Sequence, residues 1–150
     1  MYARTFVAGW GDMDFNSHMR NTAFLDHAAD VRLMFFADNG FSAEEFAKRR
    51  FGPVIRKDEL EYFREVALLQ EISIHLAVGG LAPDGSRFII RNDVFHMDGT
   101  LCARVTSAGG WLDLAARKLI APPEALVTAL RSLPRTETYT DLPSSVRNGR

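Results

Sequence analysis

The sequence predicts a single α+β domain in which one long buried helix packs against an antiparallel sheet. Three observations predict this class: an early apolar stretch with helical periodicity, four later segments of strand character, and tight-turn signals between the last three of them. The chain has 150 residues, the length of one domain. Its composition, 47% hydrophobic and 25% charged residues, is that of a globular protein and excludes disordered and fibrous classes.

The first strand and the long helix come from the first quarter of the chain. Residues 2–10 are rich in aromatic and β-branched types, which favours a strand. After a polar segment, residues 22–38 place apolar side chains at helical spacing and on nearly every side, so this helix is expected to be buried. We expect Asn21 to be its N-cap and Asn39-Gly40 to end it.

The remaining elements follow in order along the chain. Ser42 should cap a short helix over 42–50, and strands are expected over 52–65, 71–78, 87–97 and 100–113. Turn signals at Pro83-Asp84-Gly85 and Asp98-Gly99 make the last three strands antiparallel, and Pro122-Pro123 starts a short final helix. We therefore expect a domain over residues 1–133 and a loose polar tail over 134–150. Free edges of such a sheet favour a homo-oligomer.

Charge and cysteine content restrict the surroundings and the partners. The net charge of −1 provides no basic field for nucleic acid. The single cysteine, Cys102, is typical of a reducing compartment. No signal-peptide pattern is evident, and the longest apolar run, residues 33–37, is far shorter than the ~20 residues of a membrane span. We expect a cytoplasmic protein that binds neither nucleic acid nor membranes.

Polar chemistry is densest in residues 10–21, directly before the long helix, and the first two hypotheses for it involve a metal. Asp12, Asp14 and Asn16 imitate the start of a calcium loop, but Ser17 stands where that loop needs Gly, and the bidentate Glu is missing. Asp12, Asp14 and His18, joined by His27 or His96, could bind a transition metal, although the spacing matches no zinc pattern.

The third hypothesis is a carboxylate that acts on a carbonyl at the helix N-terminus. The first amides of a helix are unpaired and lie at its positive end, so they can stabilise an oxyanion. Asp14 lies seven residues before Asn21, within loop reach of such a carbonyl. Its carboxylate could attack directly or activate water.

The pattern Asp12-x-Asp14-x-x-x-His18-Met19-x-Asn21, followed by Phe24-Leu25 and Arg32, resembles the signature of the hotdog-fold thioesterases. Within them it is most similar to the 4-hydroxybenzoyl-CoA thioesterase-like acyl-CoA thioesterases. The resemblance extends over about residues 2–132, with 61–64 and 113–122 similar to the family's later strands. It implies the hotdog fold, in which a five-stranded antiparallel sheet wraps around one long buried helix.

The resemblance also implies a function. The protein would be an acyl-CoA hydrolase in which Asp14 is the nucleophile or general base, the backbone N–H near Asn21 is the oxyanion donor, and His18 supports the site. No metal or organic cofactor would be needed. The substrate would be an acyl-CoA or acyl carrier thioester, bound between the subunits of a homodimer or homotetramer.

Two alternatives remain open. Ser17, Arg20 and Gln70 depart from the family pattern, which favours a non-catalytic acyl-thioester-binding hotdog protein. A hydratase or dehydratase of enoyl thioesters would need a His–acid pair, for which His27 and Asp30 are the candidates.

Overall fold

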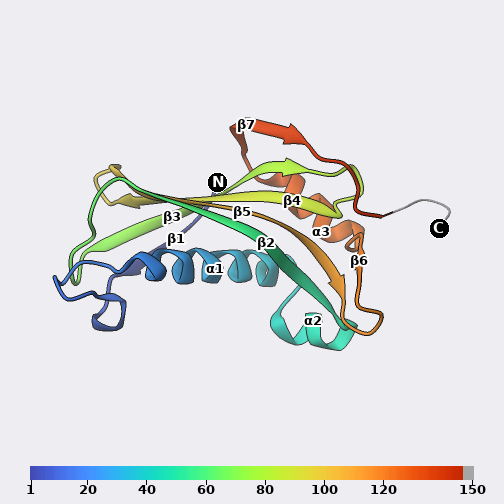
Figure 1. The fold of residues 1–150 in the computed structure, drawn as a ribbon, viewed down its shortest axis with the longest axis horizontal. Helices are drawn as coiled ribbons and strands as arrows, with labels where there is room; N and C mark the ends of the chain where they lie inside the picture. Colours follow the sequence, from blue (N-terminus) through green and yellow to red (C-terminus); the bar gives the residue numbers. More distant parts are fainter. Residues whose placement is uncertain (147–150) are drawn as a thin grey trace.

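The computed structural model describes residues 1–146 and confirms the α+β class. A curled antiparallel sheet wraps around the central helix α1, Asn21–Asp38, which lies along its concave side (Figure 1). The sheet is built on five strands in the order β1-β3-β4-β5-β2. These are β1 Tyr2–Val7, β2 Phe51–Tyr62, β3 Glu71–Leu81, β4 Arg87–His96 and β5 Leu101–Asp113. Short elements complete it: a 3-10 helix Trp10–Asp12, α2 Ala43–Arg49, β6 Lys118–Ile120, α3 Glu124–Ser132 and β7 Arg135–Asp141.

Local turn chemistry connects the strands as the sequence predicts. Gly85 and Gly99 adopt positive φ angles of 74° and 90° in the turns that precede β4 and β5. Ser42 caps α2 by accepting a hydrogen bond from the Glu45 amide at 3.1 Å. At the end of α1, Gly40 has a φ of 90°, and the Phe41 amide donates back to the Phe36 carbonyl at 2.8 Å. Both predicted helix-end signals are therefore confirmed.

The helix α1 is buried on the side that faces the sheet and open on the other. Its buried residues include Phe24, Val31 and Phe35. Leu33 is 54% exposed and Met34 37% exposed, although both are apolar. The prediction of a helix buried all round is thus wrong for a single chain, because the sheet curls around only part of the helix circumference.

Arg32 is the charged residue that α1 carries into the core. It is 5% exposed, and its Nε donates to the Asn92 Oδ1 of β4 at 2.8 Å, while its Nη2 is buried without a partner among residues 1–146. Burial lowers the pKa of Arg32 to about 10, and the charge of Asp58 opposes that shift. The direct hydrogen-bond partner of this buried arginine is therefore a neutral amide rather than a carboxylate.

Residues 135–141 depart from the loose tail that composition predicts for 134–150, whose last four residues, 147–150, lie outside the described part of the chain. Residues Arg135–Asp141 form β7, which pairs in parallel with β3 at Val78–Leu81. The first strand β1 reaches along β3 only as far as Leu76, so β7 occupies the remaining free edge. The prediction of a loose tail is wrong for residues 135–141, because the free edge of β3 offers them hydrogen bonds that composition does not reveal.

No helix among residues 1–146 is long and apolar enough to cross a bilayer.

Cys102, at the start of β5, is fully buried, as expected of a small core residue. Burial raises the pKa of its thiol to about 11. At pH 8 only about one native thiol in a thousand should then be ionised. Ellman's reagent should therefore react slowly with the folded protein and rapidly after unfolding in urea. Equal reaction rates in the folded and the unfolded protein would contradict a buried, protonated Cys102.

Candidate active site

The segment with the densest polar chemistry forms a tight hairpin before α1. Met13 and Met19 pair across it, the Asp14 amide donates to the His18 carbonyl at 2.8 Å, and the Arg20 amide donates to the Asp12 carbonyl at 2.8 Å. The Met19 amide donates to Val66 at 2.7 Å, which ties the hairpin to the loop between β2 and β3. These bonds deliver the chain directly to the first turn of α1.

Asp14 lies exposed near the tip of this hairpin. Its Oδ1 accepts hydrogen bonds from the backbone amides of Asn16 at 2.8 Å and His18 at 3.2 Å. Its Oδ2 accepts none from the residues that the structure describes. One carboxylate oxygen thus orients the side chain through the loop, and the other is left for water or a ligand.

The start of α1 differs from the prediction in one residue. The N-cap is Arg20, whose extended backbone (φ −69°, ψ 153°) is held by its bond to Asp12, and Asn21 is already helical. The Asn21 N-cap is therefore wrong. Within residues 1–146, neither the Asn21 nor the Thr22 amide donates a hydrogen bond, as expected for a first helical turn.

Arg20 also covers this helix end with its side chain. Its Nε donates to Thr22 Oγ1 at 3.1 Å, its Nη1 donates to the Gly11 carbonyl, and its Nη2 lies 3.4 Å from Asp26 Oδ2. The unpaired amides lie at the positive end of the helix dipole, and the guanidinium beside them shares its charge with Asp26. The site therefore favours a ligand atom that carries or develops negative charge.

His18 and Asn21 are each held by a residue from β2 or the loop after it. His18 Nε2 lies 3.2 Å from Glu65 Oε2, and the Tyr62 hydroxyl donates to the Asn21 carbonyl at 3.2 Å. Burial raises the pKa of Tyr62, which keeps this hydroxyl protonated as a donor. Sequence reasoning did not assign roles to Tyr62 and Glu65, since pairs 41 and 47 residues apart leave no local signal.

Asp12 and His27 pair with each other. Asp12 Oδ2 accepts from the Gly9 amide at 3.1 Å and lies 3.0 Å from His27 Nε2. Partial burial by itself would raise the pKa of Asp12, but the bonds from His27 and Gly9 outweigh it and hold the pKa below its usual value. Asp12 is thus a capping residue of the loop before α1. The His27–Asp30 pair that a hydratase would need is not formed, because His27 points to Asp12.

The metal hypotheses gain no geometric support from residues 1–146, where no three His, Cys, Asp or Glu side chains are grouped to hold an ion.

Ser17 shows what one departure from the family pattern does to the hairpin. Its φ is 58°, a left-handed conformation that glycine adopts without strain. Replacing Ser17 by Gly should raise the free energy of unfolding by about 0.5–1 kcal/mol, measured by urea denaturation. Ser42→Gly is the matched control: Ser42 is an extended N-cap, so the same exchange should destabilise the protein slightly. A loss of stability in Ser17→Gly would contradict the strain argument.

Comparison of the chain with known proteins identifies its family. Residues 8–130 match the family model of the thioesterase-like superfamily. No match was found among curated proteins.

Solved structures share the fold at low sequence identity. A Staphylococcus aureus protein solved in complex with CoA has a TM-score of 0.81 and 19% identity, covering 99% of this chain and 89% of its own. A 1,4-dihydroxy-2-naphthoyl-CoA thioesterase from Synechocystis has a TM-score of 0.79 and 15% identity, covering 88% and 96%. A gentisyl-coenzyme A thioesterase has a TM-score of 0.75 and 15% identity, covering 85% and 98%. These likenesses confirm the hotdog fold.

Proposed function

The chain belongs to the thioesterase-like superfamily, and from this membership we propose that it hydrolyses acyl thioesters, with acyl-CoA as the first substrate class to test. The observation that carries the proposal is the hairpin geometry. It presents a carboxylate with a free oxygen, Asp14 Oδ2, on the segment that leads into the unpaired amides of α1.

In the proposed reaction the Asp14 carboxylate takes the proton of water, and the amides stabilise the negative charge that develops on the carbonyl oxygen. With Asp14 as general base, water attacks the thioester carbonyl carbon while the carboxylate takes its proton. The carbonyl oxygen becomes an oxyanion that the amides of Asn21 and Thr22 stabilise. The C–S bond then breaks, the acid is released, and the thiolate leaves to be protonated. With Asp14 as nucleophile, a mixed anhydride forms first and water hydrolyses it.

His18 serves as a positioning residue in this proposal. Its side chain is fixed by Glu65, and its amide is one of the two that orient Asp14. In this role His18 keeps the hairpin in the conformation that binds the carboxylate, without a direct part in proton transfer.

The functional unit is proposed to be a homodimer formed through β2. This strand ends the sheet, so its outer edge of 12 residues has no partner strand in residues 1–146. Ile55 and Tyr62 on it are 43% and 45% exposed. A long unpaired edge with apolar side chains favours pairing with a second copy around a two-fold axis. Such pairing would place the acyl group between the two subunits.

Light scattering after size exclusion tests the dimer. The expected mass is twice the 16.8 kDa of the chain, or a higher even multiple. The backbone amides of β2 should exchange with deuterium more slowly at concentrations that favour the oligomer. A single-chain mass at every concentration would contradict the proposal.

Hydrolysis is tested by a thiol-release screen of the wild-type protein with short, long and aromatic acyl-CoAs. We expect release from at least one of them. Acyl-CoA binding without thiol release from any thioester would indicate instead the non-catalytic acyl-binding protein, which the Arg20 and Ser17 departures favour.

A further inference from the structure

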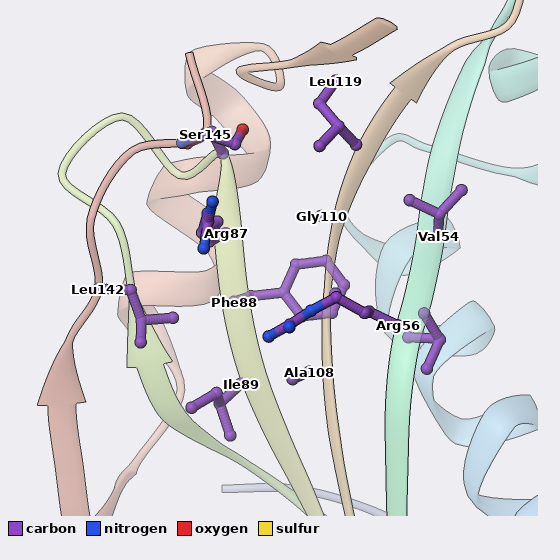
Figure 2. A pocket seen from close by; sticks show the side chains of 13 residues that line it. Val54, Arg56, Arg87, Phe88, Ile89, Ala108, Gly110, Leu119, Leu142 and Ser145 are labelled. Carbon is purple, nitrogen blue, oxygen red and sulfur yellow. The ribbon is translucent and has the colours of Figure 1, made fainter. Parts of the chain in front are cut away.

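A second candidate site lies far from the Asp14 hairpin, in a hollow on the outer face of the sheet (Figure 2). Its volume is about 230 Å³. On β4, Phe88 and Ile90 are buried in the core, so the alternation of a strand turns Arg87 and Ile89 to the outer face. Ala108 and Gly110 of β5 form the floor, where the lack of bulky side chains leaves the space open.

The wall of the hollow is built by the chain that follows β7. The Leu142 amide donates to the Leu81 carbonyl at 3.1 Å, and the Ser145 amide donates to Ser86 Oγ at 2.9 Å. Asp84 accepts from Ser144 Oγ at 2.5 Å and from Ser86 Oγ at 2.6 Å. Partial burial alone would raise the pKa of Asp84, but these bonds outweigh it and lower the pKa. The carboxylate therefore stays ionised and holds the wall in place at neutral pH.

Two arginines give the hollow its charge. Arg56 reaches from β2 across the hollow toward β4, and Arg87 projects from β4 (Figure 2). In the described part of the chain, neither guanidinium forms a salt bridge with a carboxylate. The Oγ of Ser145, which also lines the hollow, is buried and has no hydrogen-bond partner among residues 1–146. The remaining lining is apolar and includes Val54, Ile89, Leu119 and Leu142.

We propose that this hollow binds a phosphate monoester whose organic part is apolar or aromatic. Two guanidinium groups balance the double charge of a phosphate monoester, whereas a carboxylate would leave one of them uncompensated. The Ser145 hydroxyl supplies a further donor, and the apolar lining accepts the organic group. The volume is below the roughly 300 Å³ at which pockets for whole drug-sized ligands begin, so a compact group fits.

Two sources could supply this chemistry: the ribose phosphate of a CoA thioester, or a small phosphate ester that is not a substrate. The first rests on the proposed function. The hollow lies at the β6 end of the sheet and the Asp14 hairpin at the opposite end of α1 (Figure 1), whose 18 residues extend about 27 Å. A thioester seated here would therefore serve the site of a second copy, because antiparallel β2 pairing places the Tyr62 end of one β2 near the Phe51 end of the other, the end of the sheet where the hollow lies.

Calorimetry on the full chain tests the proposal with phenyl phosphate, adenosine 3′,5′-bisphosphate, benzoate and inorganic phosphate. Phenyl phosphate should bind more tightly than either benzoate or inorganic phosphate. The double variant Arg56→Gln/Arg87→Gln should lower the affinity for phenyl phosphate by at least about tenfold, and Ser145→Ala should lower it by a smaller factor. Lys48→Gln removes one positive charge from the exposed surface of α2 and should change nothing.

Kinetics separate the two sources. If the CoA phosphate occupies the hollow, the double variant raises KM for an acyl-CoA and leaves KM for the matching acyl-pantetheine, which lacks the nucleotide, unchanged. If a separate ligand occupies it, both KM values stay unchanged while phenyl phosphate binding is lost. Either result supports a phosphate-ester site. Absence of phosphate-ester binding to the wild type, or equal binding to the double variant, would overturn it. Because binding is measured without turnover, an inactive wild type would refute the proposed function and leave this test intact.

Discussion

Replacing Asp14 by Asn should lower kcat/KM for acyl-thioester hydrolysis by about 10²–10⁴-fold, the range that a positioned base contributes. An asparagine side-chain oxygen can still accept the bonds that Asn16 and His18 donate to Oδ1, so the hairpin keeps its shape. What is lost is the second carboxylate oxygen, which would take the proton of the attacking water or attack the carbonyl itself. Thiol release measures the change, and urea denaturation shows that the fold is retained.

Asp113 provides the matched control for this variant. It lies at the end of β5 and accepts bonds from the Ala115 and Ala116 amides, both at 2.9 Å, so it also uses one carboxylate oxygen to order a loop. Asp113→Asn should leave hydrolysis unchanged. If Asp14→Asn retains the wild-type rate, Asp14 is not the catalyst. If both variants lose activity equally, the effect is one of charge or stability rather than of chemistry.

Trp111→Ala should cause the largest loss of stability, about 3–5 kcal/mol of the free energy of unfolding. Trp111 of β5 is fully buried. Its ring lies within 5.5–6.2 Å of four phenylalanine rings from α1, α2, β2 and β4: Phe36, Phe46, Phe51 and Phe88. Its Nε1 donates to the Gly85 carbonyl at 3.1 Å. Truncation would open a cavity where these elements meet, and a loss of this size is a large part of the about 5–15 kcal/mol that stabilises a domain.

Two tryptophan variants calibrate this measurement, which circular dichroism in urea can follow. Trp111→Phe keeps most of the ring contacts and loses only the hydrogen bond to Gly85, so it should lower the free energy of unfolding less than Trp111→Ala does. Trp10 is 79% exposed, and Trp10→Ala should stay within about 0.5 kcal/mol of wild type. A loss below about 1 kcal/mol in Trp111→Ala would show that the aromatic cluster is not the main source of stability.

The elements that depend on neighbouring residues could be predicted from the sequence. The α1 pattern, the Ser42 cap and the turns at Gly85 and Gly99 each rest on contacts a few residues apart. The resemblance of the segment from Asp12 to Arg32 to a family signature predicted the hotdog fold, which the solved structures confirm. The catalytic role of Asp14 stays a prediction, since the structure shows its position and hydrogen bonds but not its chemistry.

Contacts between distant residues were decided by the tertiary structure. Asp12 pairs with His27, Tyr62 with Asn21, and Arg32 with Asn92, at separations of 15, 41 and 60 residues. The basic hollow likewise joins β2, β4, β5 and the chain after β7. The sequence alone determined where helices and turns form, because their hydrogen bonds join residues that are only a few positions apart in the sequence. Only the folded sheet decided which edge was free for β7 and which side chains meet, because register and curvature bring remote segments together.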